Sequence, residues 1–119
     1  MTGRITTHVL DLSIGKPACG VLVELWEAGT GNKFDLLQIS YTNDDGRVNQ
    51  PLLEGSKIKT GIYEIRFHVG DYFRKRGTLH EEPSFLECVP IRFGISDPAS
   101  HYHVPLLISP GGYSTYRGS

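Results

Sequence analysis

The stretch "HYHVPLLISPGGYSTYRGS", residues 101–119, points to the fold class because it reads as two extended segments joined by a turn. Tyr102, Val104 and Leu106 alternate with other residues, which is typical of a strand with one buried face. Residues 109–112, "SPGG", have turn chemistry, and the β-branched and aromatic residues of 112–118 favour a second strand. An ordered strand pair is therefore predicted in a part of the chain that usually frays.

The same period of two runs through the rest of the chain. Every second residue is large and apolar in 63–69 and 89–95, and "VLVEL" at 21–25 alternates likewise. Residues 4–12 and 34–42 are also strand-like, and "QPLL" at 50–53 is a candidate short edge strand. Segments rich in Gly, Asn, Asp and Pro separate these runs. About seven or eight short strands at this spacing predict an all-β antiparallel sandwich or barrel.

One short helix and one domain complete the expected organisation. "DYFRKRG" at 71–77 is the one helical candidate, with Asp71 as its N-cap and Gly77 as its stop. With 119 residues and no linker or repeat, the chain is expected to form a single domain over 1–119. Because no secretory signal is recognised, Cys19 and Cys88 are expected to be two reduced, buried thiols, with a disulfide as the alternative.

Composition argues against several classes of function. The formal net charge is -1 and there is no basic block, which argues against nucleic-acid and membrane partners. No apolar run approaches the ~20 residues that span a bilayer. "MTGRITTHVLDL" lacks the apolar core of a secretory signal, so a cytoplasmic location is expected.

Histidines are the candidate reactive groups. His101 and His103 share one face of their strand, opposite Val104 and Leu106, and therefore point away from the core. The side to which His8 points is left open by the pattern. These histidines are either plain strand residues, or a metal site of His8, His101 and His103, or general acid–base groups. No acidic or thiol ligand accompanies them, which weakens the metal interpretation.

Two other features are ambiguous by themselves. Arg47 follows the "DDG" turn and is either a solvated charge or a fixed cationic fork for a ligand. The segment that contains Tyr113, Tyr116 and Arg117 has no alternating apolar residues of its own to bury in the core. Its polar and aromatic composition favours a role in an interface or a functional site.

Several motifs together resemble the 5-hydroxyisourate hydrolase branch of the transthyretin-like proteins. They are the terminal "YRGS", "THVLD" near the start, "TNDDGR" in the middle, "GIYEIRF", and "FLECVPIRFGISDPASHYHVPLL". The resemblance covers residues 5–119. It implies a transthyretin-like sandwich of two four-stranded sheets with one short helix, and a homotetramer built as a dimer of dimers with sites in the channel between dimers.

The resemblance also implies a reaction and a set of residues. The reaction is hydrolysis of the cyclic amide of 5-hydroxyisourate to 2-oxo-4-hydroxy-4-carboxy-5-ureidoimidazoline in urate degradation, without metal or other cofactor. Matching positions give His8, Arg47, His103 and Ser119 as catalytic, and His8, Arg47 and Tyr116 as substrate-binding. Ser119 would act through its hydroxyl or, as the last residue, its carboxylate. A non-catalytic carrier on the same fold and a zinc enzyme remain the alternatives.

Overall fold

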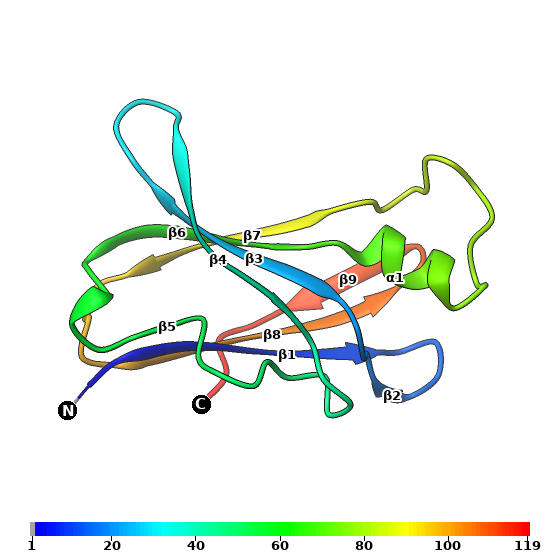
Figure 1. The fold of residues 1–119 in the computed structure, drawn as a ribbon, viewed down its shortest axis with the longest axis horizontal. Coiled ribbons are helices and arrows are strands. Elements are labelled where there is room, and N and C mark those ends of the chain that lie inside the picture. Colours follow the sequence, from blue (N-terminus) through cyan, green and yellow to red (C-terminus); the bar gives the residue numbers. More distant parts are fainter. Residues whose placement is uncertain (1) are drawn as a thin grey trace.

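The structure, a computed structural model, describes residues 2–119 and contains two β-sheets stacked as layers (Figure 1). Its elements are β1 (Arg4–Asp11), β2 (Lys16–Pro17), β3 (Leu22–Ala28), β4 (Phe34–Tyr41), β5 (Leu53–Glu54), the 3-10 turn η1 (Gly55–Lys57), β6 (Gly61–Phe67), α1 (Val69–Lys75), β7 (Val89–Ile95), β8 (His101–Ser109) and β9 (Gly112–Thr115). One sheet has the order β4-β3-β6-β7 and is antiparallel throughout. The other has the order β2-β1-β8-β9, with β5 paired to the start of β1, and its β1–β8 pair is parallel.

The predicted sandwich is confirmed, but one sheet has five strands instead of four. Two of its members, β2 and β5, have two residues each and pair with opposite ends of β1. β5 begins within the predicted edge strand 50–53, whereas β2 lies where only a turn was expected. A strand as short as β2 carries no periodicity, so the pattern does not reveal it.

The last strand is shorter than predicted, for a reason visible in its register. β9 pairs with β8 from Gly112 opposite Ser109 to Thr115 opposite Leu106. The next hydrogen-bonded position falls opposite Pro105, which has no N–H to donate. Pairing resumes in the same register at an isolated bridge between Gly118 and His103. The segment is therefore ordered to Gly118, as expected, but it is a continuous strand only to Thr115.

The core fills the space between the sheets, and its members follow the predicted alternation. Tyr102, Val104 and Leu106 of β8 are buried, and so are the inward residues of β6 and the ends of β7. Fully burying each large apolar side chain contributes about 1.5–3 kcal/mol. The largest buried side chains are Tyr63, Phe67, Phe73, Ile5, Leu25, Leu52, Ile65, Ile95, Leu106 and Ile108.

Helix α1 begins two residues before the predicted start. Its N-cap is His68, whose backbone N–H still bonds to Leu22, so the chain turns directly from the sheet into the helix and Asp71 lies in the first turn. The predicted stop is confirmed, because Gly77 has φ +76° just beyond the C-cap Arg76.

A buried carboxylate fastens this helix to β1. Asp11 is 0% exposed and accepts hydrogen bonds from the Tyr72 hydroxyl at 2.7 Å and from Arg76 Nη1 at 3.0 Å. The Ser13 backbone N–H caps the same carboxylate at 2.9 Å. Burial and the Asp11 hydrogen bond raise the pKa of Tyr72 far above its usual value, so the phenol remains a donor.

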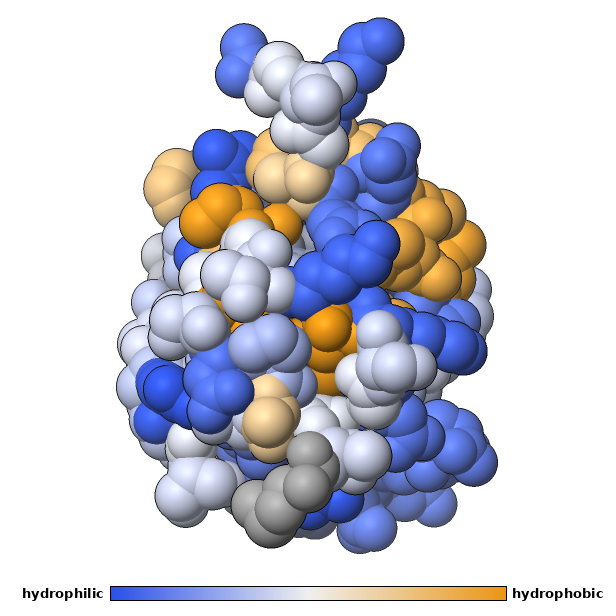
Figure 2. Space-filling model, turned by 90° about the vertical axis from the view of Figure 1, so that its left-hand side faces the viewer, coloured by the Kyte–Doolittle hydropathy of each residue, from blue (hydrophilic) through white to orange (hydrophobic). Residues whose placement is uncertain are grey.

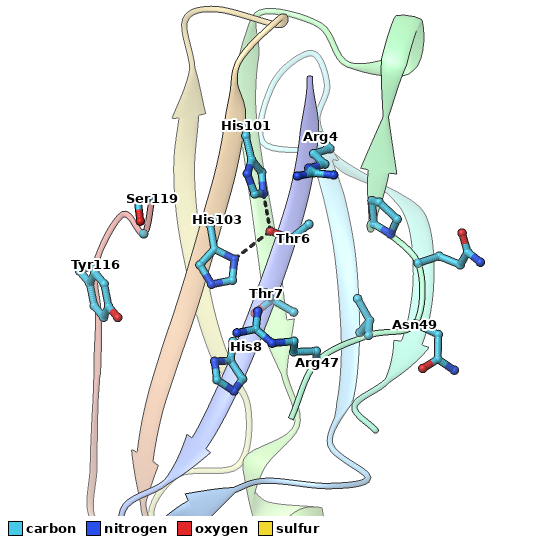
Figure 3. Close-up of a pocket in the computed structure, with 14 residues that line it drawn as sticks. Arg4, Thr6, Thr7, His8, Arg47, Asn49, His101, His103, Tyr116 and Ser119 are labelled. Atoms are coloured by element: carbon cyan, nitrogen blue, oxygen red, sulfur yellow. Dashed lines mark hydrogen bonds between the residues drawn. The ribbon is translucent and has the colours of Figure 1, made fainter. Parts of the chain in front are cut away.

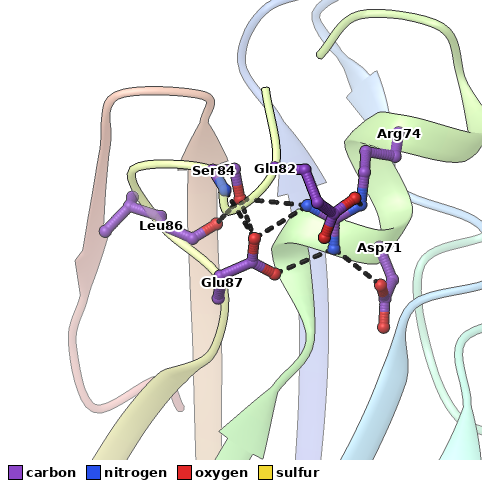
Figure 4. A network of polar contacts seen from close by, with 6 residues as sticks. All are labelled: Asp71, Arg74, Glu82, Ser84, Leu86 and Glu87. Carbon is purple, nitrogen blue, oxygen red and sulfur yellow. Dashed lines mark hydrogen bonds and ion pairs between the residues drawn. The ribbon is translucent and has the colours of Figure 1, made fainter. Parts of the chain in front are cut away.

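A second polar network holds the loop between α1 and β7 (Figure 4). The two terminal nitrogens of Arg74 each donate to one oxygen of Glu87 at 2.8 Å, and Nη2 also reaches Asp71. The backbone N–H and the hydroxyl of Ser84 donate to the same Glu87 carboxylate. Hydrogen bonds from Arg74 and then Ser84 lower the pKa of Glu87 to about 2.

The prediction of buried thiols is wrong, although both cysteines are free. Cys88 alternates with the buried Val89 and is therefore turned outward. Cys19 follows the buried Ala18 and donates to Asp44 at the surface.

The outer surface carries both apolar and hydrophilic residues. Figure 2 shows apolar residues in separate groups among hydrophilic ones on the side of the molecule that lies on the left in Figure 1. Within residues 2–119, no helix has the length and apolar character needed to cross a membrane.

Candidate active site

The candidate site is built on the outer face of the paired strands β1 and β8. Ile5, Thr7 and Val9 of β1 are buried, so the alternate residues Thr6 and His8 point away from the core. The parallel register places Thr6 opposite His103 and His8 opposite Pro105. The side to which His8 points, which the sequence left open, is thereby fixed: His8 lies on the same face as His101 and His103.

Arg47 is brought to this face by the turn that precedes it. Asn43 Oδ1 accepts hydrogen bonds from the backbone N–H groups of Asp45 and Arg47, and Gly46 N–H donates to the Asn43 carbonyl at 2.9 Å. Gly46 has φ +75°, and a Cβ there would lie 2.4 Å from the carbonyl oxygen of Val9. This close approach lets the turn bridge to β1, so that Arg47 pairs with His8 across an isolated bridge.

Residues 116–119 reach the site from the other side of β8. The Gly118 N–H donates to the His103 carbonyl at 2.8 Å. A Cβ on Gly118 would lie 2.5 Å from Cδ2 of His103, so a glycine is required for this contact. Figure 3 shows Ser119 and Tyr116 on this side, with His103 between them and Arg47.

All five predicted site residues, His8, Arg47, His103, Tyr116 and Ser119, line one groove of about 520 Å³. They come from β1, the turn after β4, β8 and the segment after β9, so distant parts of the sequence meet here. Tyr116 is 61% exposed and contributes an open wall. The groove is also lined by Arg4, Thr6, Thr7, Val48, Asn49, Gln50, Pro51, His101 and Gly118.

A threonine hydroxyl joins two of the histidines. Thr6 Oγ1 lies 2.7 Å from Nε2 of His101 and 2.8 Å from Nδ1 of His103, and Figure 3 shows both rings turned toward it. Because Nδ1 of His103 faces Thr6, its Nε2 is the nitrogen left for another partner.

The electrostatics favour neutral histidines. Burial, and then the positive charge of Arg47, lower the pKa of both His8 and His103 below 6.5. Burial, and then Arg4 and Arg117, lower the pKa of His101 in the same direction. Neutral imidazoles at neutral pH are able to take a proton, while the fixed charge of Arg47 attracts carbonyl or oxyanion oxygens.

The zinc alternative is not supported by this geometry. Residues 2–119 contain no group of three or more His, Cys, Asp or Glu side chains placed to hold one metal ion. His101 and His103 instead direct one ring nitrogen each to Thr6.

Sequence reasoning missed Thr6 and Gly118. Thr6 was detectable in part, because it lies two residues before His8 and therefore shares its face. Gly118 carries no such signal, because its importance arises from a contact with another strand.

Comparisons with known proteins identify the family of this chain. A family model described as HIUase/Transthyretin family matches residues 5–118. The chain belongs to this family.

Curated relatives and solved structures match over most or all of this chain. A 5-hydroxyisourate hydrolase of Halalkalibacterium halodurans is 56% identical over 119 residues, which cover all of both chains. Among solved structures, the 5-hydroxyisourate hydrolase of Klebsiella pneumoniae is 36% identical, with a TM-score of 0.81 and coverage of 98% of this chain and 99% of that one. A structure of (S)-allantoin synthase is 44% identical with a TM-score of 0.91, but this chain spans only 44% of its length.

Sea bream transthyretin in complex with thyroxine, at 22% identity, has a TM-score of 0.86 over 97% of this chain and 94% of that one. This likeness confirms the transthyretin-like fold that the motifs implied.

Proposed function

We propose that this chain is a hydrolase that opens the cyclic amide ring of 5-hydroxyisourate in urate degradation, the substrate named for its relatives. The observation that carries the proposal is the shared groove of His8, Arg47 and His103, because it joins two neutral imidazoles to one fixed cation. Residues 1–119 act as one domain in this proposal.

The chemistry needs a base, an oxyanion partner and an acid. A water oxygen attacks the amide carbonyl carbon while a histidine, His8 or His103, takes one proton from that water. The Arg47 guanidinium binds the carbonyl oxygen as it gains negative charge. The carbon–nitrogen bond of the ring then breaks, and the ring nitrogen takes its proton from a histidine. A general base of this kind contributes about 10²–10⁴-fold in rate.

Ser119 and Tyr116 complete the groove on the side of β9. Ser119 is proposed to orient the water or a histidine, and Tyr116 to contact the substrate. Both line the groove, and Gly118 fixes the segment that carries them against His103.

A homotetramer, arranged as a dimer of dimers in the cytoplasm, is part of the proposal. In the single chain, Tyr113 and Tyr116 are 46% and 61% exposed on and beside β9, and a partner across this edge would cover them. Light scattering at micromolar concentration tests the assembly, and a monomer would contradict it.

The activity itself is tested by generating 5-hydroxyisourate from urate with a urate oxidase and following its ultraviolet absorbance. Added protein is expected to accelerate the decay. His103→Ala is expected to remove most of this acceleration, whereas His80→Ala, in an exposed loop outside the groove, is the matched control and should retain it. An unchanged decay with folded wild-type protein would refute the proposal.

A further inference from the structure

The Thr6 hydroxyl occupies an unusual position between two imidazoles. It lies 2.7 Å from Nε2 of His101 and 2.8 Å from Nδ1 of His103, within hydrogen-bond distance of both (Figure 3). The β1–β8 register creates this arrangement, because Thr6 is paired with His103 while His101 is two residues earlier on the same face of β8.

A hydroxyl has one hydrogen, so Thr6 is able to donate to only one of the two rings at a time. A His103 that takes a proton at Nε2 must carry its hydrogen on Nδ1, because a neutral imidazole has one N–H. Nδ1–H then donates to Thr6 Oγ1. The hydrogen of Thr6 is left for Nε2 of His101, which accepts it only when that nitrogen is unprotonated.

We propose that Thr6, with His101 acting through it, holds His103 in the tautomer that leaves Nε2 free to accept a proton from water. Thr6 and His101 are thus positioning residues. The inference rests on the proposed hydrolase function and assigns His103, instead of His8, as the proton acceptor.

The arrangement also suits the charged intermediate of the reaction. When Nε2 takes the water proton, the water oxygen forms its bond to the amide carbon and His103 becomes an imidazolium. The Nδ1–H···Oγ1 hydrogen bond is already in place and needs no rearrangement. Nε2 then gives the same proton to the ring nitrogen as the carbon–nitrogen bond breaks, and His103 returns to its starting tautomer.

Two further observations support this assignment. Burial and neighbouring positive groups lower the pKa of both His101 and His103. This favours the neutral rings that the hydrogen bonds through Thr6 require. Gly118 packs against Cδ2 of His103, so the ring is held between Thr6 and Gly118.

The direct test is nitrogen NMR on histidine-labelled protein above pH 7, with the His103 signals assigned by their loss in His103→Gln. In the wild type, Nδ1 of His103 is expected to carry the hydrogen. In Thr6→Val, which keeps the shape of the side chain and removes the hydroxyl, the other tautomer should become populated. Thr6→Ser should restore the wild-type signals. A wild-type His103 protonated on Nε2 would overturn the proposal.

Kinetics provide the second test. Thr6→Val should lower kcat by about 10- to 100-fold, as removal of a partner that orients a reactive histidine does elsewhere. KM should change little, because Thr6 positions His103 instead of binding the substrate. Thr115→Val is the matched control, since it removes another strand hydroxyl, which donates to Pro105, and should keep the wild-type rate.

A double-mutant cycle separates action through Thr6 from direct action of His101. His101→Ala should lower kcat, but combining it with Thr6→Val should be no worse than Thr6→Val alone. Additive losses would overturn the role assigned to His101, and an unchanged kcat in Thr6→Val would overturn that of Thr6. A wild-type protein without hydrolase activity would refute the proposed function instead, and the NMR result would still decide the tautomer.

Discussion

Gly118→Ala tests whether the segment after β9 is needed to position the reactive histidine. The new Cβ would lie 2.5 Å from Cδ2 of His103, whereas ordinary contacts begin at about 3.4 Å, so one of the two groups must move by about 0.9 Å. His103 is held on its other side by Thr6 at 2.8 Å, and the Gly118 backbone is held by its hydrogen bond to His103. Neither is therefore able to yield without loss of a contact.

The expected loss is large in rate and small in stability. A misplacement of about 1 Å can cost about 10²-fold in rate, which corresponds to about 2.7 kcal/mol of transition-state stabilisation. Loss of the single Gly118–His103 hydrogen bond costs only about 0.5–1.5 kcal/mol of folding free energy. We therefore expect kcat/KM to fall about 100-fold, measured by decay of 5-hydroxyisourate absorbance, while circular dichroism shows a folded sandwich.

Gly111→Ala provides the matched control. Gly111 lies in the turn between β8 and β9, its φ is not positive, and a Cβ there meets no atom within 4 Å. This variant should keep the wild-type rate. If Gly118→Ala hydrolyses substrate as fast as Gly111→Ala, the close contact with His103 has no role in positioning and the argument is wrong.

Four further predictions concern the groove and its support. His8→Ala, Arg47→Ala and His103→Ala should each lower kcat at least 10²-fold while the fold is retained, as checked by circular dichroism; near wild-type turnover would remove that residue from the catalytic set. Activity should decline as pH falls, with an apparent pKa below 6.5, because burial and Arg47 lower the pKa of His8 and His103 and so preserve their neutral forms; a kcat/KM profile with a midpoint above 6.5 would contradict this. Incubation with a chelator should leave the rate unchanged, and a loss that zinc restores would favour the metal mechanism. Asp11→Ala should lower the free energy of unfolding by about 3 kcal/mol in urea titrations, since it leaves the buried Tyr72 hydroxyl and Arg76 without their shared acceptor; an unchanged midpoint would show that this network is dispensable.

Much of the sandwich was predictable from local pattern. Alternation in residues 63–69 and 89–95 identified both the strands and their buried faces, because a period of two follows directly from strand geometry. Gly77 ended the helix as expected, since a positive φ favours glycine. The start of the helix and strand β2 were not predictable, because hydrogen bonds to distant backbone groups fix them, whereas β5 begins within the predicted edge strand 50–53.

The predicted site residues came from motifs and not from periodicity. His8, Arg47, His103, Tyr116 and Ser119 were identified from stretches that resemble a known family, and the structure shows that one groove contains them all. The alternation of residues alone left open the side to which His8 points. It also left open whether the histidines are plain strand residues, metal ligands or general acid–base groups.

By itself the sequence determined the alternation of buried and exposed residues along each strand, and with it the outward facing of His101 and His103. Only the tertiary structure decided that Thr6 lies between those two rings and that Gly118 packs against one of them. The physical reason is that strand alternation is a property of consecutive residues, whereas register is a property of two segments. The Thr6–His103 contact joins residues 97 positions apart, and the parallel pairing of β1 with β8 sets its geometry.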